Sequence, residues 1–525
     1  SLLGQYSALA TADQAILNSS SAMVGFLRGD TANLGTVFRD RQHVLGDTVH
    51  SKPIFVEAPT ADYTDAGYAA FKAAQASRIG TLYVGANDGM IHAFDETTGA
   101  ERWAYVPKLL MPNMYLLAEK FYLSGHRFFV DGEQVVGDVK FSNGNWKTIL
   151  VSGMGKGARG FVALDVTDPN NPLPLWEICH DSTLCGVSNV NLGYSFGNPV
   201  ITKRPSDGKW VVIVTSGHNN VSPGDGKGRL YVLDAETGAI LNGSGSGTSN
   251  SSGSTSAPSG LSRLNVWVDD PQYDNTGKYA YAGDLNGDMW RFDLTGSSVS
   301  VMKMGTFRNA SGQTQPVTVK PELMKCDSLP MVVLGTGKLL GQSDLTTTQI
   351  QSLYGIVDKG VPYPNASLAS GSFRVDNLVQ QTSTTSGSNI TMSNNAVNLT
   401  GGANGWFYDL PAGERVNIDP AVALGTLTIV GNSPTSSNPC ENGGISTFYT
   451  VAGCTGGPVL STSTTDPQGR KNPNAMTAGC SIYQLADGTL GSVCVTTAGD
   501  PINYSIPVSS SAAGLRRVSW RELVQ

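Results

Sequence analysis

A short repeated pattern constrains the fold of this chain more than any other feature. Each copy is a strand-like run, a glycine-containing turn and a second run that ends in Asp, often with Thr-Gly shortly after it. The terminal residues of five copies are Asp95, Asp165, Asp234, Asp293 and Asp358, which lie 70, 69, 59 and 65 residues apart. An Asp-initiated turn closed by glycine suits each copy. The spacing fits one four-stranded β-propeller blade with long loops.

The number of copies sets the size of the expected propeller. Residues 483–488 resemble a further copy, about two periods after Asp358. One blade cannot bury both of its faces, so the blades must stack in a closed ring. We therefore expect an all-β fold with six or seven blades, and an array of β-sandwiches is the main alternative.

The N-terminal segment and two internal stretches differ in composition from the repeats and suggest the domain organisation. Gln5 to Met23 is rich in Ala, Leu and Gln and predicts a helix. We expect a lead-in over residues 1–45 and the propeller over 46–525. Stretches near 241–261 and 380–400 are rich in Ser, Thr, Gly and Asn, and we expect them to be mobile insertions.

Composition and charge narrow the class of protein. The chain has 62 Gly and only 15% charged residues, as suits an exported all-β protein with many turns. Its 35 Lys and Arg against 42 Asp and Glu give a net charge of −7, so we expect no nucleic-acid partner. No run of 18 apolar residues is present to span a membrane as a helix. The chain begins with Ser1 and shows no signal peptide, so we expect a fragment of a longer protein.

Seven cysteines point to an oxidising compartment. Three sequential pairs would each close a short loop, and Cys326 is left over; the pairs are Cys179–Cys185, Cys440–Cys454 and Cys480–Cys494. Seven reduced and mostly buried thiols are the alternative. No Cys-x-x-Cys occurs, so we expect neither a zinc cluster nor a redox dithiol.

A set of motifs occurs in a fixed order along nearly the whole chain. The motifs are Arg28-Gly-Asp30, Phe38-Arg-Asp-Arg41, Leu45-Gly-Asp47, Ser51-Lys-Pro53, Tyr83–Phe94, Gly155–Gly160, Leu192–Pro199, Tyr281–Asp293 and Ser519–Leu523. The repeat Leu82–Gly99 looks like those of quinoprotein-type propellers. The ordered set as a whole resembles the C-terminal domain of the PilY/PilC family of type IV pilus tip proteins.

This resemblance implies a function that composition alone does not show. Such a protein is exported through the periplasm and outer membrane to the cell surface, where it sits at the pilus tip. It docks minor pilins, promotes pilus assembly and opposes retraction. The alternative is an adhesin for a host-cell receptor or an abiotic surface.

The resemblance also implies a calcium loop before the strand at Tyr281. The ligand positions are Asp270, Gln272, Asp274, Thr276 through its carbonyl, and Lys278. The last position needs a carboxylate, because Ca²⁺ takes oxygen ligands and an ammonium group cannot bind it. We therefore expect a degenerate, vestigial hairpin loop that holds calcium weakly or not at all, with an occupied calcium site as the alternative.

Two further segments are candidate binding sites. Arg28-Gly29-Asp30 would serve as an integrin ligand if it lay exposed on a turn; alternatively, it is scaffold, with Asp30 capping the next turn. Gly217 to Gly228 is polar and glycine-rich enough to bind a partner, although a long blade loop is the simpler interpretation.

A quinone-dependent dehydrogenase is the remote enzymatic alternative. Such enzymes need a channel Ca²⁺, a catalytic Asp and a Trp beneath the cofactor, and they commonly carry a disulfide between adjacent cysteines. The chain has no Cys-Cys pair, and its eight Trp residues follow no consistent position in the repeats. No hydrolase or phosphate-binding motif occurs either. We therefore expect a binding and assembly module and no enzyme.

Overall fold

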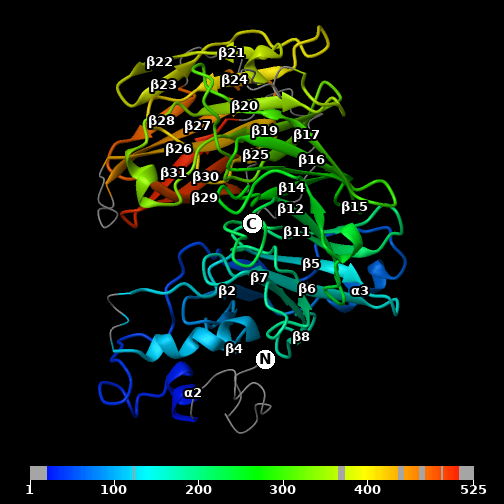
Figure 1. Ribbon diagram of the computed structural model, residues 1–525, viewed down its shortest axis with the longest axis vertical. Helices are drawn as coiled ribbons and strands as arrows, with labels where there is room; N and C mark the ends of the chain where they lie inside the picture. Colours follow the sequence, from blue (N-terminus) through cyan, green and yellow to red (C-terminus); the bar gives the residue numbers. More distant parts are fainter. Residues whose placement is uncertain are drawn as a thin grey trace. The chain divides into compact units, whose positions relative to one another are not determined.

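The computed structural model describes residues 21–120, 122, 125–364, 373–435, 443–459, 467–485 and 489–507 (Figure 1). The chain divides into two compact units. Unit 1 comprises Ser1–Ser262, Gln272–Thr276 and Thr295–Val299, and unit 2 comprises Arg263–Pro271, Gly277–Leu294 and Ser300–Gln525. Each unit is built from antiparallel strands that follow one another as meanders.

Unit 1 contains three meanders and a few short helices. The first has β1 (Ile54–Val56), β2 (Thr81–Gly85), β3 (Ile91–Asp95) and β4 (Glu101–Tyr105). The second has β5 (Gln134–Lys140), β6 (Trp146–Gly153), β7 (Gly160–Asp165) and β8 (Leu173–Cys179), with β9 (Val187–Ser188) parallel to β8. The third has β10 (Val200–Lys203), β11 (Trp210–Thr215), β12 (Arg229–Asp234) and β13 (Thr248–Ser249). The helices are α2 (Ser21–Leu27), α3 (Tyr68–Ala74), η2 (Lys108–Ala118) and η4 (Gly243–Gly245).

Four more meanders follow, and all but the start of β15 belong to unit 2. They begin with β14 (Leu264–Asp270), β15 (Asp274–Gly283), β16 (Asp288–Asp293) and β17 (Ser300–Thr306). Next come β18 (Glu322–Cys326), β19 (Leu329–Gly335), β20 (Ser352–Val357) and β24 (Gly405–Asp409), with β21 (Val379–Gln381) parallel to β24. The sixth has β25 (Ala421–Ala423), β26 (Thr426–Pro434), β27 (Gly444–Ala452) and β28 (Gly469–Asn472), extended by β23 (Asn389–Met392) and β22 (Ser383–Ser386). The last has β29 (Thr477–Gln484), β30 (Leu490–Thr496) and β31 (Pro501–Ile506), and two short helices are η5 (Gln342–Thr346) and η6 (Phe373–Val375).

The Asp-terminated repeats form the second and third strands of successive meanders. β3, β7 and β12 end at Asp95, Asp165 and Asp234. The Asp95 carboxylate accepts a 2.8 Å hydrogen bond from the backbone N–H of Thr98, and Gly99, with φ at 68°, donates to the Asp95 carbonyl. The predicted Asp-initiated turn closed by glycine is therefore present, because the carboxylate satisfies turn amides that no strand can reach.

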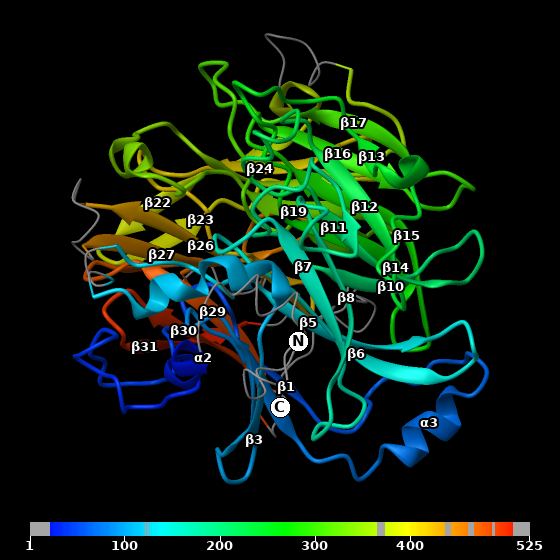
Figure 2. The ribbon, with the colours of Figure 1, turned by 60° about the horizontal axis from the view of Figure 1, so that its bottom comes forward.

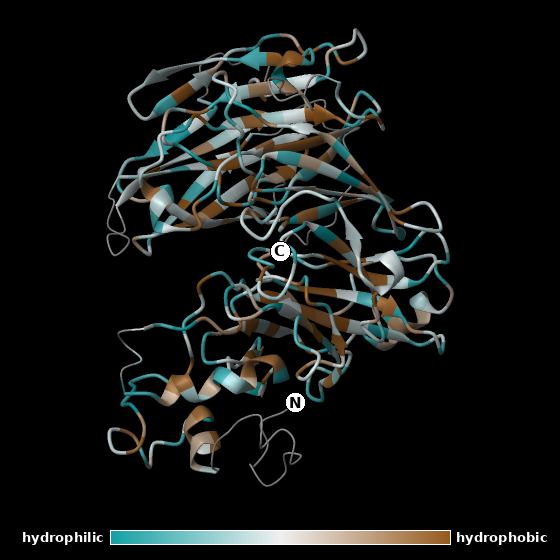
Figure 3. Ribbon diagram, in the orientation of Figure 1, coloured by the Kyte–Doolittle hydropathy of each residue, from teal (hydrophilic) through white to brown (hydrophobic). Residues whose placement is uncertain are grey.

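Within each unit the meanders pack face to face in chain order. Leu150 of β6 packs in a core cluster with Ile91 of the first meander, whereas its neighbour Ile149 packs with Val212 of the third. Successive strand residues point to opposite faces, so the second meander is buried on both sides. Figure 3 shows the hydrophobic residues concentrated along the strands, and Figures 1 and 2 both show β5 to β8 side by side. Such stacking is how propeller blades bury their faces.

The same construction continues in unit 2. One core cluster joins the fourth meander to the fifth through Tyr281 and Val332. A second joins the fifth to the sixth through Val333 and Leu427, and a third joins the sixth to the seventh where Phe448 stacks on Tyr504 at 4.2 Å. The all-β prediction is confirmed. Seven meanders occur among the described residues, where the paired strands form six sheets, and the number of blades stays a prediction.

The predicted lead-in is described only from residue 21 onward. The described part of the expected helix is α2 (Ser21–Leu27), and residues 1–20 lie outside the described part of the chain. Phe26, Leu27 and Phe38 are buried in the same core cluster as the first meander. The described part of the lead-in, residues 21–45, therefore packs into unit 1, because its apolar side chains cover a face of the first meander. The closing motif at Ser519–Leu523 also lies outside the described residues.

The two expected insertions carry more regular structure than their composition suggested. The stretch 241–261 contributes β13 to the third meander, and Leu261 at its end is fully buried. The stretch 380–400 contains β22 and β23, and β23 pairs with β28. Their mobility remains a prediction, but neither is a structureless loop, because backbone pairing with a neighbouring sheet does not require apolar side chains.

The structure contains two of the three predicted disulfides, Cys179–Cys185 and Cys480–Cys494. The predicted Cys440–Cys454 pair is wrong, because Cys454 is bonded to Cys326, 128 residues away. β18 ends at Cys326 and the turn after β27 carries Cys454, and both residues belong to the core between the fifth and sixth meanders. Cys440 lies outside the described residues. Across the residues described, no helix combines the length and apolarity needed to cross a membrane.

Candidate functional site

The loops that carry the sequence motifs gather at one end of the strands in unit 1. In each of its meanders the first strand begins beside the end of the second, as in the pairing of Gln134 with Ser152. The loop that enters a meander therefore lies next to the turn between its second and third strands. We call these segments the loop face of unit 1; they are residues 45–53, 86–90, 126–133, 154–159, 189–199 and 216–228.

Hydrogen bonds tie the loop face of one meander to the next. The Asn87 side-chain oxygen accepts a 2.9 Å bond from the backbone N–H of Phe129, which links the first meander to the second. The backbone N–H of Gly155 donates to the Ser195 carbonyl at 3.2 Å, which links the second to the third. The motifs noted in the sequence are thus the segments that join neighbouring meanders.

A buried arginine organises the two longest segments of the loop face. The Arg159 guanidinium donates to the backbone carbonyls of Leu192 at 2.6 Å, Val190 at 3.1 Å, Val221 at 3.2 Å and Pro223 at 2.7 Å. Five donors in a rigid plane suit this arrangement. Arg159 therefore holds residues 189–199 and 216–228 in one shape relative to each other.

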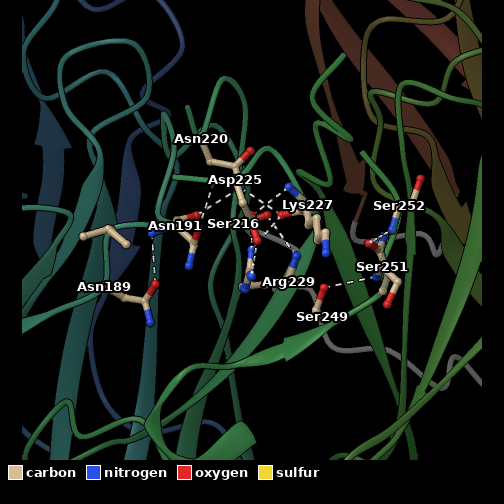
Figure 4. A network of polar contacts seen from close by, with 12 residues as sticks. Asn189, Asn191, Ser216, Asn220, Asp225, Lys227, Arg229, Ser249, Ser251 and Ser252 are labelled. Atoms are coloured by element: carbon tan, nitrogen blue, oxygen red, sulfur yellow. Dashed lines mark hydrogen bonds and ion pairs between the residues drawn. The ribbon is translucent and has the colours of Figure 1, made fainter. Parts of the chain in front are cut away.

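An ion pair forms the centre of the polar network at this end of unit 1 (Figure 4). The two Asp225 oxygens accept bonds of 2.6 and 2.7 Å from the Arg229 guanidinium, and these lower the pKa of Asp225 to about 2. The Asp225 carboxylate also accepts from the backbone N–H of Lys227 at 3.0 Å. The Asn191 side-chain oxygen accepts from the Asp225 N–H at 3.1 Å, and Asn220 donates to the Lys227 carbonyl at 2.8 Å. The loop is therefore fixed along its length.

The stretch after β13 joins the same network. The backbone N–H of Gly228 donates to the Ser252 carbonyl at 3.0 Å, and the Ser249 hydroxyl oxygen accepts from the Ser251 N–H at 3.1 Å (Figure 4). Lys227 and Ser251 are exposed, so each presents a polar side chain from backbone that is held in place. Such a surface suits binding through hydrogen bonds and charge.

Arg28-Gly29-Asp30 forms the C-terminal cap of α2. The backbone N–H of Asp30 donates to the Gly25 carbonyl at 2.8 Å, and that of Gly29 donates to the Phe26 carbonyl at 2.9 Å. Gly29 has φ at 101°. These bonds and the left-handed glycine define a Schellman motif, which satisfies the last carbonyls of the helix. The tripeptide therefore has a structural role, while the side chains of Arg28 and Asp30 are exposed.

Asp30 also begins the next turn. Its carboxylate accepts a 2.9 Å hydrogen bond from the backbone N–H of Ala32. The capping interpretation of Asp30 thus has direct geometric support. Receptor binding by the tripeptide stays a prediction, although the exposed turn meets its structural requirement.

The expected calcium loop is the hairpin between β14, which ends at Asp270, and β15, which begins at Asp274. In unit 1, Lys203 donates to Asp274 at 2.7 Å and Thr276 donates to the same carboxylate at 2.6 Å. Burial raises the pKa of Asp274, but these hydrogen bonds outweigh it and hold the pKa below its usual range. Gln272 donates its amide to the Asp62 carboxylate at 2.9 Å.

Two candidate positions remain: Asp270, the last residue of β14, and Lys278, whose ammonium group cannot bind calcium. In unit 2, the Lys278 ammonium is paired with Asp269. The described residues contain no cluster of three or more His, Cys, Asp and Glu that could hold a metal. Because lysine ammonium groups neutralise carboxylates of this hairpin, the residues present do not fit a calcium ion, and weak or absent binding remains the prediction.

Comparison with known proteins places this architecture in a family. The model of the PilY1 β-propeller domain matches residues 45–395, about two thirds of the chain. The chain belongs to the PilY1 β-propeller family. The match begins at the first segment of the loop face and includes all three meanders of unit 1, so the resemblance seen in the motifs is confirmed.

Two curated relatives and one solved structure extend the comparison. The chain is 31% identical to a type IV pilus biogenesis factor PilY1 homolog of Xylella fastidiosa, over 97% of this chain and 42% of that protein. It is 32% identical to the type IV pilus biogenesis factor PilY1 of Pseudomonas aeruginosa strain PAK, over 83% of this chain and 40% of that protein. The chain thus spans about two fifths of these relatives. The crystal structure of the Pseudomonas aeruginosa PilY1 C-terminal domain matches with a TM-score of 0.64 at 26% identity, covering 85% of this chain and 98% of that one, and confirms the β-propeller class.

Sequence reasoning alone did not identify several residues of this PilY1-family loop face. Arg159, Asn191 and Arg229 were not singled out, although Arg159 lies inside one of the motifs and the other two directly flank Leu192–Pro199 and Gly217–Gly228. Arg159 is part of Gly155–Gly160, and its target Leu192 begins the next motif. An arginine inside one glycine-rich motif and close to others could have indicated a residue that binds loop backbone. The sequence does not show which carbonyls the arginine binds.

Proposed function

We propose that this chain is a binding and assembly module of a type IV pilus, which docks minor pilins, promotes pilus assembly and opposes retraction. The observation that carries the proposal is the match of residues 45–395 to the PilY1 β-propeller domain. Curated relatives that match most of the chain are named type IV pilus biogenesis factors, and no enzymatic activity is part of the proposal.

The loop face of unit 1 is the proposed docking surface. Its segments are held by Arg159 and by the Asp225–Arg229 pair, so they lose little freedom when a partner binds. Preorganised loops bind more tightly for this reason, because less entropy is lost on association. Lys227 and Ser251 are the exposed side chains at the centre of the network.

Export to the cell surface at the pilus tip belongs to the same proposal. Three disulfides support it, because such bonds persist in oxidising compartments and are rare in the cytosol. The low share of charged residues in the chain, 15%, also suits an exported protein.

The first experiment separates assembly from retraction in a bacterium that carries this protein. The segment encoding these residues is deleted in a normal strain and in a strain without the retraction motor, and surface pili are counted. Loss of pili in the normal strain is the expected result. Recovery in the motor-less strain would support opposition to retraction, and fewer pili than in the undeleted motor-less strain would support promotion of assembly. Normal numbers of pili in both strains would contradict the proposal.

The second experiment tests the docking surface directly. Lys227→Glu and Ser251→Arg are expected to weaken capture of purified minor pilins by about tenfold, which corresponds to roughly 1.4 kcal/mol. Lys209→Glu is the matched control, because Lys209 is exposed at the turn before β11, at the opposite end of that strand. If Lys209→Glu weakens capture as much as Lys227→Glu does, the loop face is not the contact.

The exposed turn at Arg28 to Asp30 favours a second candidate function, attachment to an integrin-type receptor. Asp30→Glu keeps the charge but moves the carboxylate, so it is expected to abolish adhesion to integrin-coated surfaces while pili remain normal in number. Asp40→Glu in the same exposed segment is the control. Unchanged adhesion by the Asp30→Glu variant would remove this candidate.

A further inference from the structure

His92 of β3 is buried between two carboxylates. Its Nδ1 lies 2.6 Å from Oε1 of Glu101 on β4, and its Nε2 lies 3.1 Å from both carboxylate oxygens of Asp88 in the turn before β3. The His92 side chain is only 6% exposed. An ionised carboxylate can only accept hydrogen bonds, so this geometry is satisfied when both ring nitrogens carry a proton. Burial lowers the pKa of His92, but the bonds and charges of Asp88 and Glu101 outweigh it and raise the pKa.

Asp88 also holds residues 39–51, which we call the strap. The strap includes the start of the first segment of the loop face. The Oδ2 atom of Asp88 accepts a 2.8 Å hydrogen bond from the backbone N–H of Gly46, and its Oδ1 accepts one from Met90 at 3.1 Å. Gly46 sits so close that a Cβ there would be 2.3 Å from the backbone nitrogen of Asp88. The Asp88 carboxylate that faces His92 is therefore also the group that binds the strap, through the backbone N–H of Gly46.

The strap connects this seat to the turn at Arg28 to Asp30. Upstream, Arg41 donates to the Phe26 carbonyl of α2 and lies 4.1 Å above the Phe26 ring. A Cβ on Gly29 would lie 3.1 Å from Cγ1 of Val44, so the turn packs against the strap. The strap thus contacts both the Asp88 carboxylate and the helix end that carries the exposed tripeptide.

The charges around the seat come from three elements. Asp88 belongs to the β2–β3 turn, Glu101 to β4 and Arg41 to the strap. Burial and then the charge of Arg39 lower the pKa of Arg41, and the charge of Asp88 opposes them in part. Asp47 of the strap is paired with His126 at 3.0 Å, on a separate segment of the loop face. With His92 protonated, Asp88 and Glu101 share a buried cation; without the proton, one ring nitrogen becomes an acceptor that faces a carboxylate.

We propose that His92 is a proton-controlled latch that seats the strap on the first meander and so fixes the turn that carries Arg28, Gly29 and Asp30. Below the ordinary pKa of histidine the imidazolium is present and the strap is tight. As pH rises through the raised pKa of the folded state, one of the two contacts becomes repulsive and the Asp88–Gly46 seat loosens. This inference concerns the strap alone and stands apart from the proposed role in pili.

Hydrogen–deuterium exchange of the full 525-residue chain between pH 5 and 10 tests the latch. Protection of the peptide that covers residues 44–47, corrected for the intrinsic pH dependence of exchange, is expected to fall at least tenfold as His92 deprotonates. Exchange of the His92 C2 proton, followed by mass spectrometry, reports that deprotonation independently. Residues 211–214 of β11 are the internal reference, because they are buried in the core.

Glu101→Gln provides a sharper variant, because its side chain is about half exposed at 48% and its loss leaves the core intact. Removing this carboxylate is expected to move both the His92 titration and the loss of strap protection to lower pH together. Glu57→Gln, an exposed change of equal charge, should move neither. The latch is refuted if protection at residues 44–47 does not change while His92 titrates, if His92 titrates at or below its ordinary pKa, or if Glu101→Gln leaves the pH dependence of protection unchanged.

Discussion

A single buried carboxyl group in unit 2 makes stability depend on pH. Glu414 is 4% exposed and lies in the loop between β24 and β25. Its Oε1 accepts a 2.7 Å hydrogen bond from the Tyr449 hydroxyl, and its Oε2 accepts one of 3.3 Å from Thr447. Burial raises the pKa of Glu414 to about 7, because neutral hydroxyl groups compensate little of the lost hydration. The protonation of this single residue is therefore set by its buried surroundings.

The raised pKa gives a signed prediction for unit 2. Between the ordinary value of 4.5 and about 7, the folded state holds a proton that the unfolded state has released, so the unfolding free energy falls as pH rises. The loss is on the order of 3 kcal/mol and levels off above pH 7. Glu414→Gln keeps the acceptor for Tyr449 and should make the unfolding free energy flat across this range and higher than wild type at pH 8. Urea titrations at several pH values measure this, with the exposed Glu57→Gln as control; an equal slope in all three proteins would contradict it.

At the scale of elements, the meanders are joined by contacts that are distant in sequence. Cys326 at the end of β18 and Cys454 after β27 connect the fifth meander to the sixth, whereas Cys179 and Cys185 close a loop of only 6 residues. A cross-link restricts the unfolded chain more when the loop it closes is longer. The two bonds should therefore contribute unequally to the stability of their units.

Removal of the long-range bond is expected to be the more costly change. Cys326→Ser with Cys454→Ser should lower the unfolding free energy by about 5 kcal/mol, and Cys179→Ser with Cys185→Ser by about 2 kcal/mol. Denaturant unfolding of both double variants measures the difference. Peptide mapping without reductant should recover the peptides of Cys326 and Cys454 linked to each other. Equal losses of stability, or a different partner for Cys454, would contradict the assignment.

At the scale of the whole molecule, both units bury apolar faces between successive meanders and carry their charges in local pairs. The hairpin after β14 shows the consequence, since Lys203 neutralises Asp274 in unit 1 and Lys278 neutralises Asp269 in unit 2. The lysine ammonium groups form ion pairs with carboxylates of this hairpin, and a divalent cation would need free carboxylates as ligands. The chain should therefore keep its structure without calcium.

Removal of calcium is accordingly expected to leave the thermal midpoint of the whole chain unchanged within about 1 °C. Calorimetric titration should show no micromolar site, and Lys278→Asp should create or strengthen one by restoring a carboxylate ligand. Lys278→Asp combined with Asp270→Ala is the control and should lose that gain. A micromolar site in the wild-type chain that disappears in Asp270→Ala would show that calcium is bound after all.

The sequence by itself determined the features that depend on neighbouring residues. The Asp95 turn with Gly99 lies within five residues, and the Cys179–Cys185 and Cys480–Cys494 pairs join residues only 6 and 14 positions apart. The repetition that predicts blades is built from equally local strand and turn patterns. Turn chemistry and strand alternation are local properties of the polypeptide, so they can be recognised without knowing which strands meet. The family resemblance rests on the same local motifs in a fixed order.

Only the tertiary structure decided the contacts between meanders. These contacts join segments that are far apart in the chain. They are the Cys326–Cys454 bond, the hydrogen bonds of Arg159 to four carbonyls, the hydrogen bond from Gly46 to Asp88 and the pairing of β23 with β28. Composition pointed to mobile loops in two stretches that in fact hold strands, because backbone hydrogen bonds form wherever a sheet edge is near. Which sheet edges and which charged groups meet depends on how whole sheet faces pack against one another. A residue pattern along the chain does not specify that packing.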